Sequence, residues 1–351
     1  MLADDLTGTL EVGAILKQAG LRVQISIGGV PAVVGDQALV IDCQTRRLPA
    51  EAALARYTEI LATGGRRAEE LYLKVDSTLR GNVAAALQAT LAHFPGRSVV
   101  FCPAYPSQGR TVENGLVLVN GEPLRARSTA DESAEPVGNG VISELLVSLG
   151  NRVICYDART EEDLRAIWAA VDAAQALVVV AGSAGLLAAR YTRRAGAGLA
   201  GGRLAGRKWI IACGSMNPAA QSQLEDSPWT VLRHPATRTE VADRLAADGG
   251  VVLATPATRS EEDVTSWLAA SVQGAGATGL VVIGGETAAS ILAACGIRSL
   301  EPGGEVLPGV PCSWVNLRGA TTPLITKAGG FGAPGLLRSL INEINKACES
   351  R

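Results

Sequence analysis

Short apolar runs alternate with longer amphipathic stretches along almost the whole chain, and this rhythm constrains the fold more than any other feature. The runs are apolar at nearly every position, which is typical of strands in a parallel sheet that helices cover on both faces. The candidate strands are residues 23–27, 38–41, 71–75, 98–102, 152–156, 176–181, 209–213, 250–254 and 280–283. The pattern therefore predicts an α/β protein built from βα units.

A glycine-rich segment at residues 194–207 divides the chain. It combines five glycines with other small residues and shows no periodicity, as expected of a linker. The length of 351 residues is enough for two domains, since single cores rarely grow beyond about 250–300 residues. We predict an N-terminal domain at 1–193 and a C-terminal domain at 208–351, each a mostly parallel sheet flanked by helices, with a ligand cleft between them.

Composition disfavours several classes of protein. A net charge of -2 argues against a nucleic-acid binder. No apolar run reaches the about 18–20 residues of a membrane span, and no secretory leader is evident. The seven cysteines are scattered without a Cys-x-x-Cys pair, which predicts buried thiols and a cytoplasmic protein. The two isolated histidines disfavour zinc sites and Ser-His catalysis.

A dense polar segment at residues 73–82 follows one of the candidate strands. Its candidate substrate-binding residues are Lys74, Asp76, Ser77, Arg80 and Asn82. An arginine can grip a carboxylate through two parallel hydrogen bonds, a lysine adds a point charge, and Asp and Asn can bind hydroxyls. The segment therefore suits a small polyhydroxy acid. The alternative is the start of a helix with Ser77 or Thr78 as its N-cap.

Adjacent carboxylates at Asp4 and Asp5 form a second polar cluster. Neighbouring carboxylates repel each other, so they usually face solvent, a cation or a substrate. The alternative is that Asp5 or Thr7 caps a helix running to about residue 19. Only three residues precede Asp4 where a strand is expected, so either this edge of the sheet is short or the start codon lies upstream.

Two arginines follow other candidate strands in the N-terminal half. Arg46 comes shortly after the strand at 38–41, together with Asp42, and could face the same crevice as the polar segment. Arg110 follows the strand at 98–102 and is a candidate for a second anion contact. Both are therefore added to the candidate substrate-binding residues.

Glycine-rich turns follow two candidate strands and one further apolar run in the C-terminal half. Gly284 and Gly285 stand between a strand and a helix, where the backbone can approach an anion and the helix N-terminus attracts it. Ser215 follows another strand, and Gly329 lies in a glycine-rich turn beside Lys327. These turns indicate phosphate binding. The alternatives are tight turns without a ligand and, near Ser215, a Ser or Asn N-cap.

In combination, these motifs resemble the four-carbon acid sugar kinase family. The matching segments occur in the family's order at residues 3–8, 74–82, 103–111, 214–215, 284–287 and 327–332. The resemblance implies an N-terminal domain that holds a sugar acid and a C-terminal domain that holds ATP. It places nucleotide contacts on Ser215, Gly284, Gly285, Glu286, Thr287 and Gly329. The family's Gly-Ser-x-Ser turn reads Gly-Ser-Met-Asn here, ending at Asn217.

The implied reaction is ATP-dependent phosphorylation of the terminal hydroxyl of threonate, erythronate or 3-oxo-tetronate to the 4-phosphate. We expect Arg80 and Lys74 to hold the carboxylate and Asp76 and Asn82 to fix the hydroxyls. Asp5, or its neighbour Asp4, would orient or deprotonate the attacking hydroxyl. Mg²⁺ would bridge the ATP phosphates, with ligands that the sequence does not identify, and domain closure would exclude water.

Two alternative functions make different demands on the sequence. An NAD-dependent dehydrogenase would need a Gly-x-Gly-x-x-Gly turn after a strand, and none occurs in that context. A non-catalytic sugar-acid sensor, or an inactive truncated paralogue, is favoured by the short start and the changed Gly-Ser turn. The expected partners are small molecules, with no nucleic acid and no membrane, and the chain could form a homo-oligomer.

Overall fold

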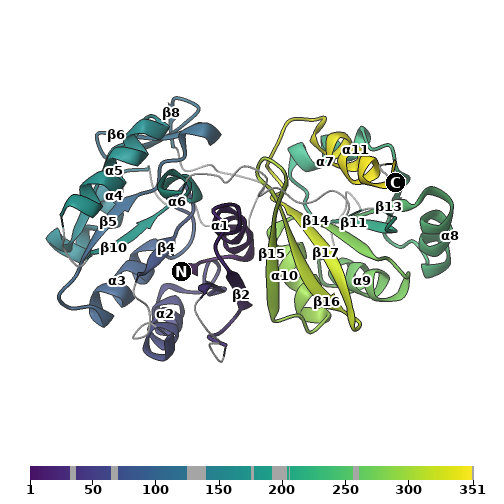
Figure 1. Ribbon diagram of the computed structural model, residues 1–351, viewed down its shortest axis with the longest axis horizontal. Coiled ribbons are helices and arrows are strands. Elements are labelled where there is room, and N and C mark those ends of the chain that lie inside the picture. Colours follow the sequence, from purple (N-terminus) through teal and green to yellow (C-terminus); the bar gives the residue numbers. More distant parts are fainter. Residues whose placement is uncertain are drawn as a thin grey trace. The chain divides into compact units, whose positions relative to one another are not determined.

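The computed structural model describes residues 1–31, 37–64, 70–124, 140–174, 178–191, 204, 206–255 and 261–349. By its internal contacts the chain divides into two compact units, Met1–Arg22 with Ser26–Arg194, and Val23–Ile25 with Ala195–Arg351. Most of the predicted linker at 194–207 lies outside the described residues. Each unit is an α/β structure with a central sheet, as predicted (Figure 1).

The sheet of the first unit is parallel throughout the strand pairs β3-β1-β4-β10-β5-β9. These strands are β1 (Leu2–Ala3), β3 (Ala38–Asp42), β4 (Tyr72–Lys74), β5 (Ser98–Cys102), β9 (Val153–Cys155) and β10 (Val178–Gly182). The strand β2 (Val23–Ile27) lies next to β3 in the strand order and straddles the division between the units. A small antiparallel sheet is formed by β6 (Arg110–Glu113), β7 (Leu116–Val119) and β8 (Glu122–Pro123).

Helices cover both faces of this sheet (Figure 1). On one side α2 (Ala50–Gly64) packs against α3 (Val83–His93). On the other, α1 (Leu6–Gln18) and α5 (Glu161–Ala173) both pack against α6 (Ala184–Arg190). The remaining short helices are α4 (Ile142–Leu145) and the 3₁₀ segments η2 (Pro106–Gln108) and η3 (Val147–Arg152).

The strand β1 is short but lies inside the sheet. Leu2 pairs with Ile41 of β3 on one side and with Leu73 of β4 on the other. The sheet is short at this point, since β1 has only two residues, but this strand lies inside the sheet and not at its edge. The strand order reverses here, since β3 and β4 extend the sheet in opposite directions from β1.

The second unit combines five parallel strands with an antiparallel meander, in the order β12-β13-β11-β14-β17-β16-β15. The parallel part holds β11 (Trp209–Cys213), β12 (Val231–Arg233), β13 (Gly250–Ala254), β14 (Gly279–Ile283) and β17 (Ala320–Lys327). The meander adds β15 (Ser299–Leu307) and β16 (Val310–Leu317). The helices are α7 (Pro218–Glu225), α8 (Arg238–Asp248), α9 (Glu261–Gly274), α10 (Gly285–Ala294) and α11 (Leu336–Glu349).

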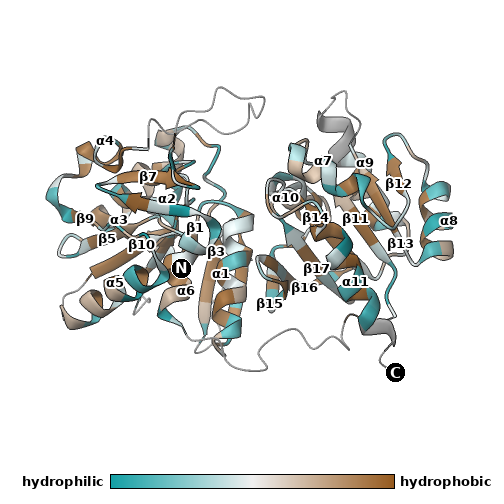
Figure 2. Cartoon of the chain, turned by 90° about the horizontal axis from the view of Figure 1, so that it is seen from above, coloured by the Kyte–Doolittle hydropathy of each residue, from teal (hydrophilic) through white to brown (hydrophobic). Residues whose placement is uncertain are grey.

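Both cores follow the apolar runs of the sequence. Every residue of β11, β13 and β14 is buried, and Figure 2 shows hydrophobic strands lying between helices whose outer faces are hydrophilic. Four of the described cysteines are buried, Cys43, Cys102, Cys213 and Cys312, whereas Cys155 is exposed. Within the described part of the chain, no helix has both the length and the apolar character that a membrane crossing requires.

Candidate active site

Polar residues of the first unit gather where β3, β1 and β4 end. The pairing register places Asp42, Ala3 and Lys74 side by side at the last positions of these strands. The turns that follow carry Asp4 and Arg46 and the segment beginning at Asp76. Open α/β sheets bind ligands at the carboxyl ends of their strands, at the point where the strand order reverses. The predicted residues therefore occupy the expected ligand-binding edge.

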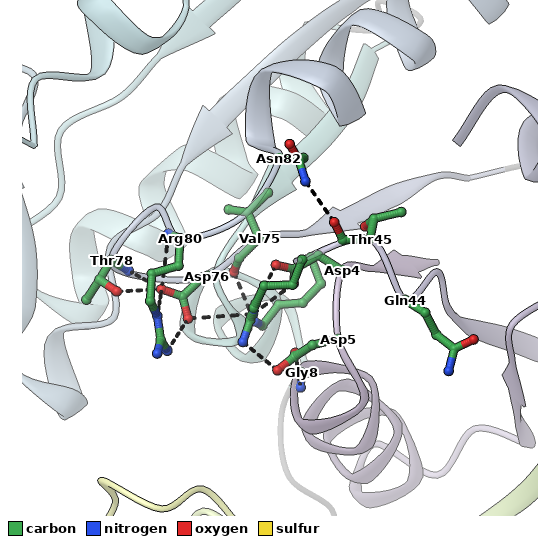
Figure 3. A network of polar contacts seen from close by, with 12 residues as sticks. Asp4, Asp5, Gly8, Gln44, Thr45, Val75, Asp76, Thr78, Arg80 and Asn82 are labelled. Atoms are coloured by element: carbon green, nitrogen blue, oxygen red, sulfur yellow. Dashed lines mark hydrogen bonds and ion pairs between the residues drawn. The ribbon is translucent and has the colours of Figure 1, made fainter. Parts of the chain in front are cut away.

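Arg46 is the common partner of three carboxylates in this cluster, Asp4, Asp5 and Asp76, which Figure 3 labels. Its Nε and Nη2 atoms donate to the two carboxylate oxygens of Asp4 at 2.8 and 2.9 Å, and its Nη1 donates to Asp5 Oδ2 at 2.5 Å. Asp76 Oδ1 lies 3.6 Å from Nη2. The Arg46 side chain is only 18% exposed. The guanidinium thus interacts with three carboxylates. It is more enclosed than an arginine that only binds a substrate anion would need to be.

Asp76 organises the turn after β4. Arg80 donates to both of its oxygens, at 3.0 Å from Nε and 2.8 Å from Nη2. The backbone N–H and the hydroxyl of Thr78 donate to Asp76 Oδ2 at 3.0 and 2.5 Å. Helix α3 begins only at Val83, so Ser77 and Thr78 are not its N-cap and that alternative was wrong. Ser77 lies half-buried in this turn, and the Arg80 side chain is 45% exposed, the most open of the charged groups here.

Lys74 and Asn82 are directed into the protein rather than outward. The Lys74 side chain is buried, and its Nζ donates to the carbonyl of Val75 at 2.9 Å. Asn82 occupies the N-cap position of α3, yet its Nδ2 donates to the carbonyls of Thr45 and Leu48 at 2.7 and 2.8 Å. Both residues therefore support the turns that carry the cluster.

Asp5 has two structural partners at once. Its backbone is extended and its Oδ1 accepts a hydrogen bond from the N–H of Gly8 at 2.9 Å, which makes it the N-cap of α1. The capping alternative for Asp5 is thus confirmed, while Oδ2 of the same carboxylate binds Arg46. The Asp5 side chain is 19% exposed against 6% for Asp4, so Asp5 is the more accessible of the pair.

Burial and charge set opposite protonation tendencies within the cluster. Burial raises the pKa of Asp4 against the attraction of Arg46. Burial also opposes ionisation of Asp76, but the neighbouring Arg80 and Arg46 hold the pKa of Asp76 well below its ordinary range. Burial, reinforced by the Asp5 charge, raises the pKa of Asp42 to about 7. Asp76 is therefore firmly ionised, whereas Asp4 and Asp42 ionise less readily than an ordinary carboxyl group.

The raised pKa of Asp42 predicts a pH-dependent stability. The native protein keeps a proton on Asp42 up to about pH 7, whereas the unfolded chain releases it near pH 4, so the free energy of unfolding falls as pH rises through this window. Asp42→Asn removes this titration while Asn keeps an oxygen to accept from the N–H of Gln44. We expect the variant to gain about 2–3 kcal/mol relative to wild type between pH 5 and pH 8 in urea unfolding. If the difference in unfolding free energy between Asp42→Asn and wild type did not depend on pH, the raised pKa of Asp42 would be contradicted.

Arg110 lies apart from these residues, at the start of β6. Its backbone pairs with Tyr105, and its guanidinium Nη1 donates to the carbonyl of Gln108. Its Nε is buried without a hydrogen-bond partner among the described residues. The structure thus shows no direct contact in its described part between Arg110 and the Arg46 cluster.

A second set of predicted residues meets in the second unit, where β11, β14 and β17 end. A Cβ atom placed on Gly329 would lie 2.1 Å from Ser215 Oγ, and one on Gly214 would lie 2.1 Å from Thr287 Oγ1. The N–H of Gly284 donates to the carbonyl of Lys327 at 2.9 Å. The three glycine-rich turns, remote in sequence, therefore form one surface at the carboxyl edge of this sheet. The strand order reverses there as well, with β13 and β14 on either side of β11.

The turn at Gly284 leaves the start of α10 open. Gly284 has a φ of 111° and provides no side chain to cap the helix. Gly285 and the exposed Glu286 begin the first turn. Backbone N–H groups at such a helix end, together with the positive end of the helix dipole, favour an anion.

Asn217 has a clear structural task beside this surface. Its Oδ1 accepts from the N–H of Ala219 at 3.0 Å and caps α7, whose first residue is Pro218. The N-cap alternative is therefore confirmed for Asn217. Ser215 Oγ accepts from the N–H of Asn217 at 3.3 Å and remains close to Gly329.

Lys327 and Gln223 also belong to this region, although neither was predicted from the sequence as a site residue. The Lys327 side chain is 2% exposed and its Nζ donates to the carbonyls of Ala328 and Phe331 at 3.0 and 2.9 Å. Burial lowers the pKa of Lys327 to about 8. Gln223 in α7 is fully buried. Lys327 could have been found from its motif, but no sequence signal distinguishes the buried Gln223 from Gln221, which is only half-buried in the same helix.

No group of three or more His, Cys, Asp or Glu residues suited to a metal ion occurs among the described residues. The carboxylates of Asp4 and Asp76 are each bound on both oxygens by a guanidinium. These residues therefore do not form a metal cage, and the ligands of Mg²⁺ are not assigned to this cluster.

Comparison with known proteins identifies the family. The family described as "Sugar-binding N-terminal domain" matches residues 1–151, and the one described as "Nucleotide-binding C-terminal domain" matches residues 219–337. A D-threonate kinase of Cupriavidus necator is 30% identical over 96% of this chain and 95% of its own length. The chain belongs to the four-carbon acid sugar kinase family. The predicted family is therefore confirmed, and the dehydrogenase alternative is disfavoured.

Other members of the four-carbon acid sugar kinase family are similar over the same span. A D-threonate kinase of Bordetella bronchiseptica is 29% identical over 96% of this chain and 95% of its own, and a 3-oxo-tetronate kinase of Brucella melitensis is 26% identical over 95% and 92%. A solved structure of a Haemophilus influenzae protein shares the fold, with a TM-score of 0.69, 21% identity and coverage of 97% of this chain and 98% of that one. Membership in this family makes the chain a kinase.

Proposed function

We propose that this kinase transfers the γ-phosphoryl group of ATP to the terminal hydroxyl of a four-carbon sugar acid, giving the 4-phosphate. The acid is threonate, erythronate or 3-oxo-tetronate. One observation carries the proposal: each unit gathers its polar or glycine-rich turns at the carboxyl edge of its sheet, where the strand order reverses. The names of the relatives, D-threonate kinase and 3-oxo-tetronate kinase, support the choice of acids.

Arg80 is the residue we assign to the substrate carboxylate. It is the most exposed cation of the cluster, and Asp76 occupies only one edge of its guanidinium. A guanidinium has five N–H donors, so its other edge can bind a carboxylate. Lys74 and Asn82 donate to backbone carbonyls of the protein. Lys74 would contribute its charge to the electrostatic potential of the site and Asn82 would maintain the shape of the site, without direct contact with the substrate.

Asp5 is the residue we assign to the attacking hydroxyl. It is more accessible than Asp4, and its contacts with Gly8 and Arg46 fix the direction of its carboxylate. Phosphoryl transfer passes through a loose transition state, so it depends on orientation and charge neutralisation more than on a strong base. Asp5 would therefore align the hydroxyl and accept its proton late in the transfer.

The glycine-rich surface of the second unit would bind ATP. The backbone N–H groups at the start of α10, from Gly285 onward, suit the phosphates, with Gly284, Ser215, Thr287 and Gly329 around them. Mg²⁺ neutralises phosphate charge when it is bound. Mg²⁺ commonly keeps several waters and binds through substrate phosphates with few protein ligands, so the proposal requires no protein cage for the ion.

Gly329→Ala should weaken ATP binding. The added Cβ would lie 2.1 Å from Ser215 Oγ and 2.9 Å from Ser215 Cβ, so the two turns must separate. We expect KM for ATP to rise about ten-fold in steady-state assays. Gly335→Ala is the matched control, because a Cβ there has no heavy atom within 4 Å. Equal KM values for both variants would remove Gly329 from the ATP site.

The decisive experiment is an assay of the purified chain with ATP, Mg²⁺ and a panel of threonate, erythronate and 3-oxo-tetronate isomers. We expect ADP release that depends on one of the acids, and a phosphomonoester at C4 by ³¹P NMR. Absence of turnover with every acid, in protein that is folded by circular dichroism, would contradict the kinase proposal. Calorimetric binding of an acid without turnover would favour the sensor alternative.

A further inference from the structure

The glycine-rich loop after β17 is held from inside the second unit by two buried side chains. Gln223 Nε2 donates to the carbonyls of Phe331, Gly332 and Ala333 at 3.2, 3.0 and 2.9 Å. Lys327 Nζ donates to the same Phe331 carbonyl at 2.9 Å. The loop that carries Gly329 is therefore fixed by hydrogen bonds from Gln223 and Lys327.

The orientation of the Gln223 amide follows from its surroundings. Three carbonyl oxygens converge on one end of this amide, so that end must be the NH₂ group, since an oxygen there would be repelled. The other end, Oε1, is buried without a hydrogen-bond partner among the described residues. A buried amide with only one end satisfied is costly, which indicates that the contacts of the NH₂ end have a function.

The position of Gln223 within the core strengthens this argument. Its neighbours on α7, Ala220 and Leu224, belong to the apolar cluster of the second unit, and the Phe331 ring packs against that cluster. An aliphatic residue at 223 would fit this environment better on packing grounds alone. The glutamine instead provides donors to the carbonyls of an irregular loop that lies between β17 and α11.

The held loop is continuous with the proposed ATP surface. From Phe331 the chain runs back through Gly330 to Gly329, where an added Cβ would meet Ser215. A loop that must present its backbone at a fixed distance from Ser215 benefits from rigid support, because preorganised groups lose less entropy on binding.

We propose that Gln223 and Lys327 are positioning residues for the nucleotide: they hold the loop of residues 328–333 in the conformation that binds phosphate, and neither touches the nucleotide itself. This inference rests on the proposed assignment of ATP to the glycine-rich surface. It assigns Lys327 an internal role, in place of the phosphate contact that a lysine in such a motif suggests.

The loop can be tested directly without substrate. Amide hydrogen exchange at Phe331 and Leu336, whose N–H groups bond to Ala328 and Ala333, should be about ten-fold faster in Gln223→Met and Lys327→Met than in wild type. Exchange in β11 and β14 should be unchanged. Gln273→Met is the control, because it removes one side-chain bond to the carbonyl of Ala294 in the same unit. Unchanged exchange in the loop of both test variants would overturn the proposal.

Kinetics then separate positioning from general destabilisation. We expect KM for ATP to rise about ten-fold in Gln223→Met and Gln223→Glu, with KM for the sugar acid unchanged. Partial unfolding alone would lower kcat and leave both KM values as they are, and that result would contradict the proposal. The same would follow if Gln223→Glu, which keeps the size but loses the donors, retained the wild-type KM for ATP.

Calorimetric titration with ATP alone distinguishes failure of this inference from failure of the proposed function. If wild type binds ATP but phosphorylates none of the acids, the kinase reaction is wrong, and weaker ATP binding by Gln223→Met still supports the positioning role. If wild type turns over and the variants bind ATP equally well, only the positioning role is wrong. If wild type binds no ATP, both are wrong.

Discussion

Arg46→Met should lose about 3–5 kcal/mol of unfolding free energy at pH 8. The guanidinium is the common partner of Asp4, Asp5 and Asp76, and its removal leaves these carboxylates facing one another in a largely buried cluster. Protonation can relieve the repulsion, so the loss should shrink as the pH falls towards 5. Urea denaturation at both pH values, followed by circular dichroism, measures the effect.

A matched control for Arg46 exists on the surface of the same unit. Arg159 pairs with Glu113 at 3.0 Å, but its side chain is 63% exposed, so Arg159→Met should change the unfolding free energy by no more than about 1 kcal/mol. The double variant Arg46→Met with Asp4→Asn should recover part of the loss, because one of the unpaired charges is gone. If Arg46→Met were as mild as Arg159→Met, Arg46 would not be the organiser of the cluster.

Asp5→Asn should lower kcat by about 10²–10⁴ in the sugar-acid assay. Asn caps helices about as well as Asp, so the bond to the N–H of Gly8 and the start of α1 should persist. The lost property is the negative charge that would align the hydroxyl and receive its proton. Steady-state kinetics with saturating ATP and acid measure the effect.

Asp163→Asn provides the control for the capping function. Asp163 belongs to the capping box of α5 with Thr160, remote from β1, and its exchange should leave turnover unchanged. Wild-type turnover in Asp5→Asn would show that Asp5 is neither the base nor an essential orienting group. Another residue of the cluster would then have to orient the attacking hydroxyl and accept its proton.

The parallel strands could be predicted because their sequences are apolar on both faces, as at β11 and β14. The meander could not. Its strand β15 contains Pro302 and two glycines with irregular pairing, and Pro311 and Pro323 interrupt the patterns of β16 and β17. The pairing of β15 with β16 shifts its register between Pro302 and Gly304 and between Glu305 and Leu307, and the local sequence does not reveal such bulges.

The candidate sites could be predicted from the sequence because of the topology of parallel sheets. Parallel strands all end at one edge, so polar residues that follow strands are brought together whatever their separation in sequence, as with Asp4, Arg46 and Asp76. Which way each side chain turns was not predictable. Lys74 ends β4 and Arg80 follows the same strand, yet Lys74 is buried and Arg80 is exposed, because burial is decided by neighbours from other segments.

The capping role of Asn217 indicates which substitution the Gly-Ser turn can accept at this position. Serine and asparagine are both strong N-cap residues, so exchanging the family's second serine for asparagine preserves the start of α7. The neighbouring Ser215, which faces Gly329, is retained. The altered motif therefore keeps the N-cap that starts α7, and the departure from the family's pattern at this position leaves the beginning of that helix intact.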